Sequence, residues 1–166
     1  MDVRTVPFDH PDAVKLNDEV MQEYVVRYGP GDDGEAEGDA TPLSASMFVP
    51  PRGLYLIVYD DRDRPVASGG WRSQRRNGEG YEDGDAELKR MYVVPQARGL
   101  GLARRVLAAL EADARAVGRS RMVLETGDRQ PEAITLYVSS GYMPSPVKFG
   151  HYREHPGSRC FIKPLT

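Results

Sequence analysis

The feature that most constrains this chain is an extended run that passes through two closely spaced glycines into a helix. Residues 85–94 are rich in Leu, Met, Tyr and Val, and Pro95 ends this run. Gly99 and Gly101 come next, and an apolar stripe of helical spacing begins at Leu102. The first amides of a helix lack partners within it, and the helix dipole is positive at that end. A phosphate or another anion therefore suits this turn.

Two details of the turn favour a phosphate. Glycine at positions 99 and 101 lets the backbone approach an anion without a Cβ in the way, and Arg98 can add a charged hydrogen bond. Glycines also precede helices for backbone reasons alone, so the bare motif leaves both interpretations open. No Gly-Lys-Ser/Thr marks a P-loop, and no set of three glycines has the dinucleotide spacing.

The remaining pattern predicts one α/β domain over residues 1–166. Apolar periodicity predicts an early helix or helix pair over 13–28, a hairpin of strands 53–59 and 66–72, a helix from 102 to Gly118, a strand over 121–126, a helix over 131–140, and extended runs over 147–152 and 159–163. The glycine-rich acidic segment 29–42 predicts a flexible loop, which is either a lid or binding loop or plain disorder.

The charge balance argues against two classes of binding partner. With 22 basic and 25 acidic residues the net charge is −3, so we expect neither nucleic acid nor an anionic membrane as the main partner. No segment is typical of a signal peptide or a membrane span, and we expect a cytoplasmic protein. The single cysteine, Cys160, predicts a buried strand thiol, and His151 and His155 lack a third ligand, so no metal site is expected.

Two motifs together resemble the GNAT superfamily of N-acetyltransferases. The first is Gln-x-x-Gly-x-Gly over residues 96–101, after a strand that reads Glu-Leu-Lys-Arg-Met-Tyr-Val. The second is Ala-Ile-Thr-Leu-Tyr-Val-Ser-Ser-Gly-Tyr over residues 133–142. They occur in the order that the superfamily has, and the resemblance is strong over 85–142, moderate over 53–72 and slight before that.

The resemblance implies a fold and a cofactor. The fold is a mixed, V-splayed central sheet flanked by helices on both faces, and the cofactor is acetyl-CoA, released as coenzyme A. The pantetheine arm would pair with backbone in the V, and a backbone amide near Tyr92 or Val93 would stabilise the oxyanion. The residues implied in cofactor binding are Met91, Tyr92, Val93, Arg98, Gly99, Leu100, Gly101, Leu102, Ala103 and Gln130, the last at a position where the superfamily often has asparagine.

The resemblance also implies catalytic roles. Tyr137 matches the tyrosine that protonates the leaving thiolate, and its alternative is a ring packed in the core. Glu87 matches a position that often serves as general base, directly or through water, and its alternative is a salt-bridged carboxylate beside Lys89 and Arg90. Glu125 is a second candidate base, and its alternative is a cap on the loop that leads to the next helix.

The implied reaction is transfer of an acetyl group to the primary amine of a small molecule, by direct attack in a ternary complex. Tyr24, Trp71, Arg72 and Arg90 are the candidates for the acceptor pocket, and arginines suit an acceptor that carries a carboxylate. The alternatives are a protein N-terminus or lysine as acceptor, and a non-catalytic acyl-CoA-binding module. Whether the protein forms a homodimer is left open.

Overall fold

The computed structural model describes residues 1–28 and 41–166, so most of the expected loop 29–42 lies outside the described residues. A seven-stranded sheet has the strand order β1-β2-β3-β4-β5-β7-β6. Along the chain the elements are β1 (Asp2–Thr5), α1 (Pro11–Tyr28), η2 (Ala45–Phe48), β2 (Gly53–Tyr59), β3 (Pro65–Gln74), β4 (Asp85–Val93), η3 (Pro95–Ala97), α2 (Leu102–Ala116), β5 (Arg121–Gly127), α3 (Pro131–Ser139), β6 (Met143–Pro144) and β7 (Ser158–Pro164).

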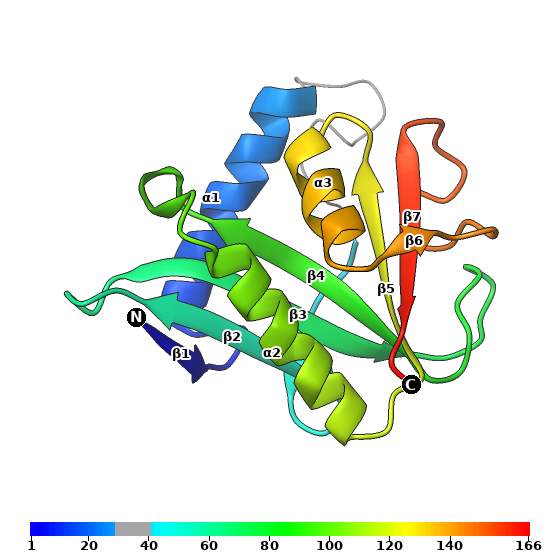
Figure 1. Ribbon diagram of the computed structural model, residues 1–166, viewed down its shortest axis with the longest axis horizontal. Coiled ribbons are helices and arrows are strands. Elements are labelled where there is room, and N and C mark those ends of the chain that lie inside the picture. The colour runs from blue at the N-terminus through cyan, green and yellow to red at the C-terminus, as the bar shows by residue number, and fades with distance from the viewer. Residues whose placement is uncertain (29–40) are drawn as a thin grey trace.

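The sheet is mixed and splayed at its centre, as expected. β4 and β5 are parallel, and the other neighbouring strands are antiparallel. The pairing of β4 with β5 stops at Glu87 and Val123, although β4 continues to Val93 and β5 to Gly127. Figure 1 shows the two strands meeting near the C-terminus and diverging from there. The divergence leaves one edge of β4 without a strand partner.

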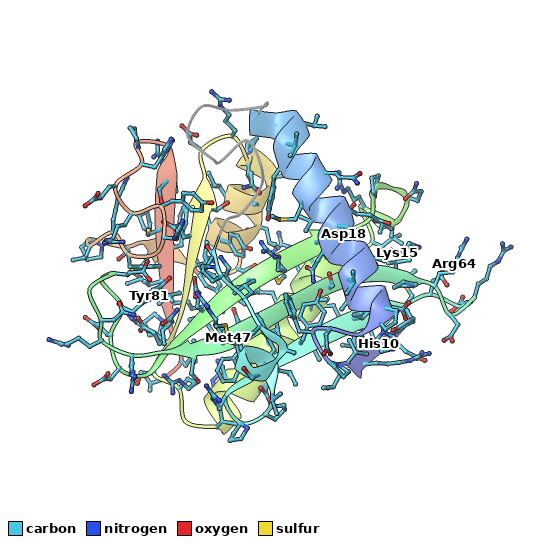
Figure 2. The ribbon with its side chains drawn as sticks, turned by 180° about the vertical axis from the view of Figure 1, so that it is seen from behind. His10, Lys15, Asp18, Met47, Arg64 and Tyr81 are labelled. Carbon is cyan, nitrogen blue, oxygen red and sulfur yellow. The ribbon has the colours of Figure 1, made fainter. Side chains whose placement is uncertain are left out.

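Helices cover both faces of the sheet, which confirms the predicted arrangement. α2 and α3 lie on the face toward the viewer in Figure 1, and α1 crosses the opposite face, as Figure 2 shows from behind. The predicted stripe of α2 is buried in the larger core, and it consists of Leu102, Val106, Leu107, Leu110 and Ala114. On the other face Ala13, Leu16 and Val20 of α1 share an apolar cluster with side chains of β2 and with Tyr92 of β4. Each sheet face thus has its own apolar layer.

Three local predictions need correction. β1 was not predicted, because its short sequence Asp-Val-Arg-Thr is an edge strand without a fully buried side chain, and only its register with β2 defines it. The expected extended run 147–152 contains turns and bends instead of a strand. The early helix begins at Pro11, before its predicted start at residue 13, and its inner face carries Ala13, Leu16 and Val20.

Candidate active site

The turn before α2 has the geometry that an anion requires. Gly99 and Gly101 have φ of 84° and 74°, in the left-handed region that disfavours other residues. A Cβ at either position would meet no atom within 4 Å, so the surrounding space is open. No side chain caps the N-terminus of α2, and the first intrahelical bond runs from the Arg105 amide to the Gly101 carbonyl. The amides of the first turn therefore remain available to a ligand.

A bulge in β4 shapes the second part of the site. Arg90 has φ of 59°, and the register with β3 shifts so that Arg90 and Met91 together oppose Gly69. Gly69 accommodates this bulge, because a Cβ there would lie 2.4 Å from the Met91 sulfur. A bulge re-aims the strand locally. It brings the backbone from Met91 to Val93 to the open edge of β4, beside the cavity described next.

A cavity of about 400 Å³ lies between the diverging strands and joins these parts. α1, β4, the turn before α2, β5 and α3 all contribute to its wall. Thirteen of the predicted site residues line it, namely Tyr24, Arg90, Met91, Tyr92, Val93, Arg98, Gly99, Gly101, Leu102, Ala103, Glu125, Gln130 and Tyr137. Among the lining residues that the sequence prediction missed, the charged ones are Glu23, Arg27, Lys89, Arg104 and Glu132. Volumes of this size accommodate small ligands.

Trp71, expected in the acceptor pocket, is not there. Its side chain is 0% exposed, packs in the core under α2, and donates a hydrogen bond of 2.8 Å to Asp113. Side chains of successive strand residues point to opposite faces, so Trp71 and Arg72 cannot share one pocket. Leu100 is 60% exposed, and it does not line the cavity.

Glu87 and Arg72 form a buried ion pair instead of lining the cavity. The Glu87 carboxylate accepts hydrogen bonds from Arg72 Nε at 2.7 Å, Gln74 Nε2 at 3.0 Å and the Tyr81 hydroxyl at 2.8 Å. Burial alone would raise the pKa of Glu87, but the positive charges of Lys89 and Arg72 lower it below its usual value. These contacts favour the salt-bridged interpretation of Glu87, and they correct the expectation for Arg72.

Tyr137 is buried at the cavity wall. Its ring packs edge-on against Tyr142 with ring centroids 5.6 Å apart, and the residue is 6% exposed. Burial raises the pKa of Tyr137 above its usual value, so the phenol keeps its proton throughout the neutral range. A protonated hydroxyl at a cavity wall can donate to a ligand atom.

Glu125 is the carboxylate of β5 that lines the cavity. The alternative role expected for Glu125 is a cap on the loop toward α3. Its hydrogen-bond partners lie elsewhere, since it accepts from the Tyr152 amide at 3.1 Å and from Ser158 Oγ at 2.9 Å. Glu125 is therefore hydrogen-bonded to Tyr152, in the segment before β7, and to Ser158 at the start of β7.

A chain of opposite charges crosses the cavity wall. Arg98, in the turn before α2, donates to both carboxylate oxygens of Glu23 on α1, at 3.0 and 2.9 Å. Glu23 also accepts from Arg27 at 3.2 Å, and Arg27 donates to Glu132 at the start of α3. The Glu23 carboxylate thus binds the Arg98 guanidinium, the group that an incoming phosphate would use.

Replacing Glu23 should consequently strengthen anion binding. We expect Glu23→Gln to bind coenzyme A about two- to fivefold more tightly, the range set by a partly exposed ion pair. Isothermal titration calorimetry measures this, with Asp18→Asn as the control, because Asp18 is exposed on the same helix (Figure 2) and does not line the cavity. Equal affinities in both variants would show that Glu23 does not compete with the ligand.

Cys160 is a buried thiol in β7, as predicted, and burial raises its pKa. Within residues 1–28 and 41–166 no group of three or more His, Cys, Asp or Glu side chains is placed to hold a metal ion. In the same ranges no helix has the length and apolar character that a bilayer crossing requires.

A parallel strand pair that splays apart, a glycine turn with open helix amides and a buried tyrosine meet in one cavity, the arrangement that the resemblance to acyl-CoA N-acyltransferases implies. The chain belongs to the acetyltransferase (GNAT) family, whose pattern it matches over residues 15–142. It is 40% identical over 134 residues to the uncharacterized N-acetyltransferase YjgM of Escherichia coli, covering 81% of this chain and 76% of that protein.

Two further relatives extend this comparison. An IAA acetyltransferase of Azospirillum brasilense is 44% identical over 84 residues, so this match spans only 51% of the chain and 54% of the relative. The fold matches the crystal structure of a provisionally assigned acyl-CoA N-acyltransferase from Klebsiella pneumoniae, with a TM-score of 0.75, 27% identity, and 99% and 97% of the two chains covered.

Proposed function

We propose that this protein transfers an acetyl group from acetyl-CoA to the primary amine of a small molecule, by direct attack in a ternary complex. The observation that carries the proposal is that one cavity is lined by the glycine turn before α2, by the open edge of β4 and by Tyr137. A ligand with a diphosphate at one end and a thioester at the other fits such a series of groups. The alternatives of a protein acceptor and of a binding module are outcomes of the test below.

The cofactor would bind along β4. Its diphosphate accepts from the amides between Arg98 and Ala103, where the dipole of α2 adds a positive potential. Its pantetheine arm pairs with the edge of β4 that β5 leaves open beyond Glu87. An amide near Tyr92 or Val93 then lies at the thioester, where it stabilises the oxyanion of the tetrahedral intermediate.

α1 favours a small acceptor over a protein. Its residues Val20, Glu23, Tyr24 and Arg27 form one wall of the cavity, and the pantetheine arm must share the same volume of about 400 Å³. The similarity to an IAA acetyltransferase supports a small molecule as well. Tyr24 and Arg90 remain candidates for acceptor contacts. We expect the enzyme to act in the reducing cytoplasm, which suits the free thiol of Cys160.

The chemistry requires an acid at the leaving group. The amine nitrogen attacks the thioester carbonyl, the C–S bond breaks, and the coenzyme A sulfur takes a proton. Tyr137 is the group that we assign to this step, because its hydroxyl remains protonated and lines the cavity.

The test measures release of the coenzyme A thiol from acetyl-CoA with a panel of amines and peptides, each added separately. We expect release to depend on the amine, with small primary amines giving rates above those of lysine-containing peptides and peptide N-termini. Faster turnover with peptides would instead support a protein acceptor. Tight coenzyme A binding without release for any amine or peptide would support a non-catalytic acyl-CoA-binding module.

A further inference from the structure

We infer that Glu125, rather than Glu87, is the general base that takes a proton from the incoming ammonium group. This inference rests on the proposed function, since it assigns a catalytic residue of the same reaction. A primary amine arrives largely as an ammonium ion, and its nitrogen cannot attack until a proton has left. A base must therefore have access to the acceptor end of the cavity.

The register of the sheet gives Glu125 that access. β5 separates from β4 after Val123, and alternation along β5 places Val123 and Glu125 on the face opposite Met122 and Leu124, which pack in the larger core. Glu125 is thus the first side chain on its face beyond the point where the strands part. It lines the same cavity as Tyr137.

The carboxylate is held in place by the segment that precedes β7. The Tyr152 amide donates to both carboxylate oxygens, at 3.3 and 3.1 Å, and Ser158 Oγ donates at 2.9 Å. Gly150, with φ of 92°, approaches so closely that a Cβ would lie 2.5 Å from one carboxylate oxygen. These contacts orient Glu125 while leaving lone pairs for a substrate proton, because a carboxylate can accept about four hydrogen bonds.

The charges around Glu125 suit a base that works near neutral pH. Lys89 and Glu87 face it from β4, and Tyr81 and Cys160 lie within electrostatic range on the same side of the sheet. Burial raises the pKa of Glu125 to about 7, although Ser158 and the Tyr152 amide act in the opposite direction. Glu87 has a lowered pKa and three protein partners, so it accepts a further proton less readily.

The proton balance assigns separate tasks to the two residues. The ammonium group gives one proton to Glu125, which later releases it to water. The nitrogen forms a bond to the carbonyl carbon, the C–S bond breaks, and the sulfur receives the proton of Tyr137. The second proton that leaves nitrogen restores Tyr137 through solvent, and the third stays in the amide, so one proton is released per turnover.

The first test is the pH profile of kcat/KM for the best amine of the panel. In wild-type protein kcat/KM should rise through pH 7 as Glu125 loses its proton, which gives the pH profile a rising limb with its midpoint near pH 7. In Glu125→Gln this limb near pH 7 should disappear and kcat/KM at pH 7 should fall on the order of 100-fold. Coenzyme A affinity and the thermal midpoint serve as folding controls, and both should stay near wild type.

Two more variants sharpen the test. Ser158→Ala removes a hydrogen bond that lowers the pKa of Glu125, so the midpoint of the limb should move to higher pH, an effect that a merely structural role would not produce. Asp128→Asn removes an exposed carboxylate three residues further along and should leave the profile unchanged.

The outcomes separate this inference from the proposed function. An active wild-type enzyme whose Glu125→Gln variant retains the limb and most of its activity would overturn the assignment of the base alone. Absence of amine-dependent thiol release in wild-type protein would overturn the proposed function instead.

Discussion

Tyr137→Phe should lower kcat for amine acetylation by about 10²- to 10³-fold, the contribution of a positioned general acid. Only the phenolic hydroxyl is lost, so the ring contact with Tyr142 and the shape of the cavity persist. The affinity for coenzyme A should remain within about twofold, because the hydroxyl meets the sulfur only as the C–S bond breaks. Steady-state thiol release and calorimetric titration with coenzyme A measure the two effects.

Tyr142→Phe is the matched control for this variant. The Tyr142 hydroxyl donates to Glu111 at 2.7 Å in the buried core and does not line the cavity. Its removal should lower the free energy of unfolding by about 1–3 kcal/mol, the cost of an unsatisfied buried partner, and leave kcat nearly unchanged. If Tyr137→Phe behaved in the same way, with lower stability and intact turnover, Tyr137 would be a core residue and not the acid.

Gly101→Leu should weaken coenzyme A binding by about 50-fold or more, equivalent to a loss of at least about 2.3 kcal/mol. The added side chain would enter the open space in front of the α2 amides and exclude the diphosphate. The left-handed φ of 74° would also cost about 1–2 kcal/mol of stability in any residue other than glycine. Calorimetric titration and chemical denaturation measure the two quantities.

Gly118→Leu separates strain from ligand exclusion. Gly118 lies beyond the other end of α2, has φ of 88°, and likewise has open space around its Cβ direction. The two variants should therefore lose similar stability, and only Gly101→Leu should lose affinity for coenzyme A. Equal affinities would indicate that the turn before α2 does not bind the cofactor.

Local sequence patterns predicted the parts of the site that one short segment builds. The strand, the glycine turn and the stripe of α2 follow one another within residues 85–116, so periodicity and glycine spacing specify them. The left-handed φ values of Gly99 and Gly101 agree with that prediction. Cys160 was also predicted as a buried thiol, because its neighbours are apolar.

Contacts between distant segments could not be predicted in this way. The Arg98 and Glu23 side chains meet although they are 75 residues apart in sequence. The surroundings of Glu87 and Glu125 depend on where β4 and β5 stop pairing, which neither strand encodes alone. Sequence pattern therefore identified both carboxylates as candidates without showing which of them lines the cavity.

One error in the prediction has a local cause. Trp71 and Arg72 were both assigned to the acceptor pocket, although strand alternation requires that they point to opposite faces of the sheet. The structure places Trp71 under α2 and pairs Arg72 with Glu87. The alternation of side chains along β3 can be inferred from the sequence, and it would have excluded at least one of the two residues from the acceptor pocket.

A crystal structure of the protein with acetyl-CoA tests the central claim most directly. We expect the diphosphate oxygens within hydrogen-bond distance of backbone amides between Arg98 and Ala103, and the pantetheine arm beside β4 from Met91 to Val93. A diphosphate bound elsewhere, with the turn before α2 unoccupied, would contradict the proposed binding mode and with it the assignment of the cavity as the acetyl-transfer site.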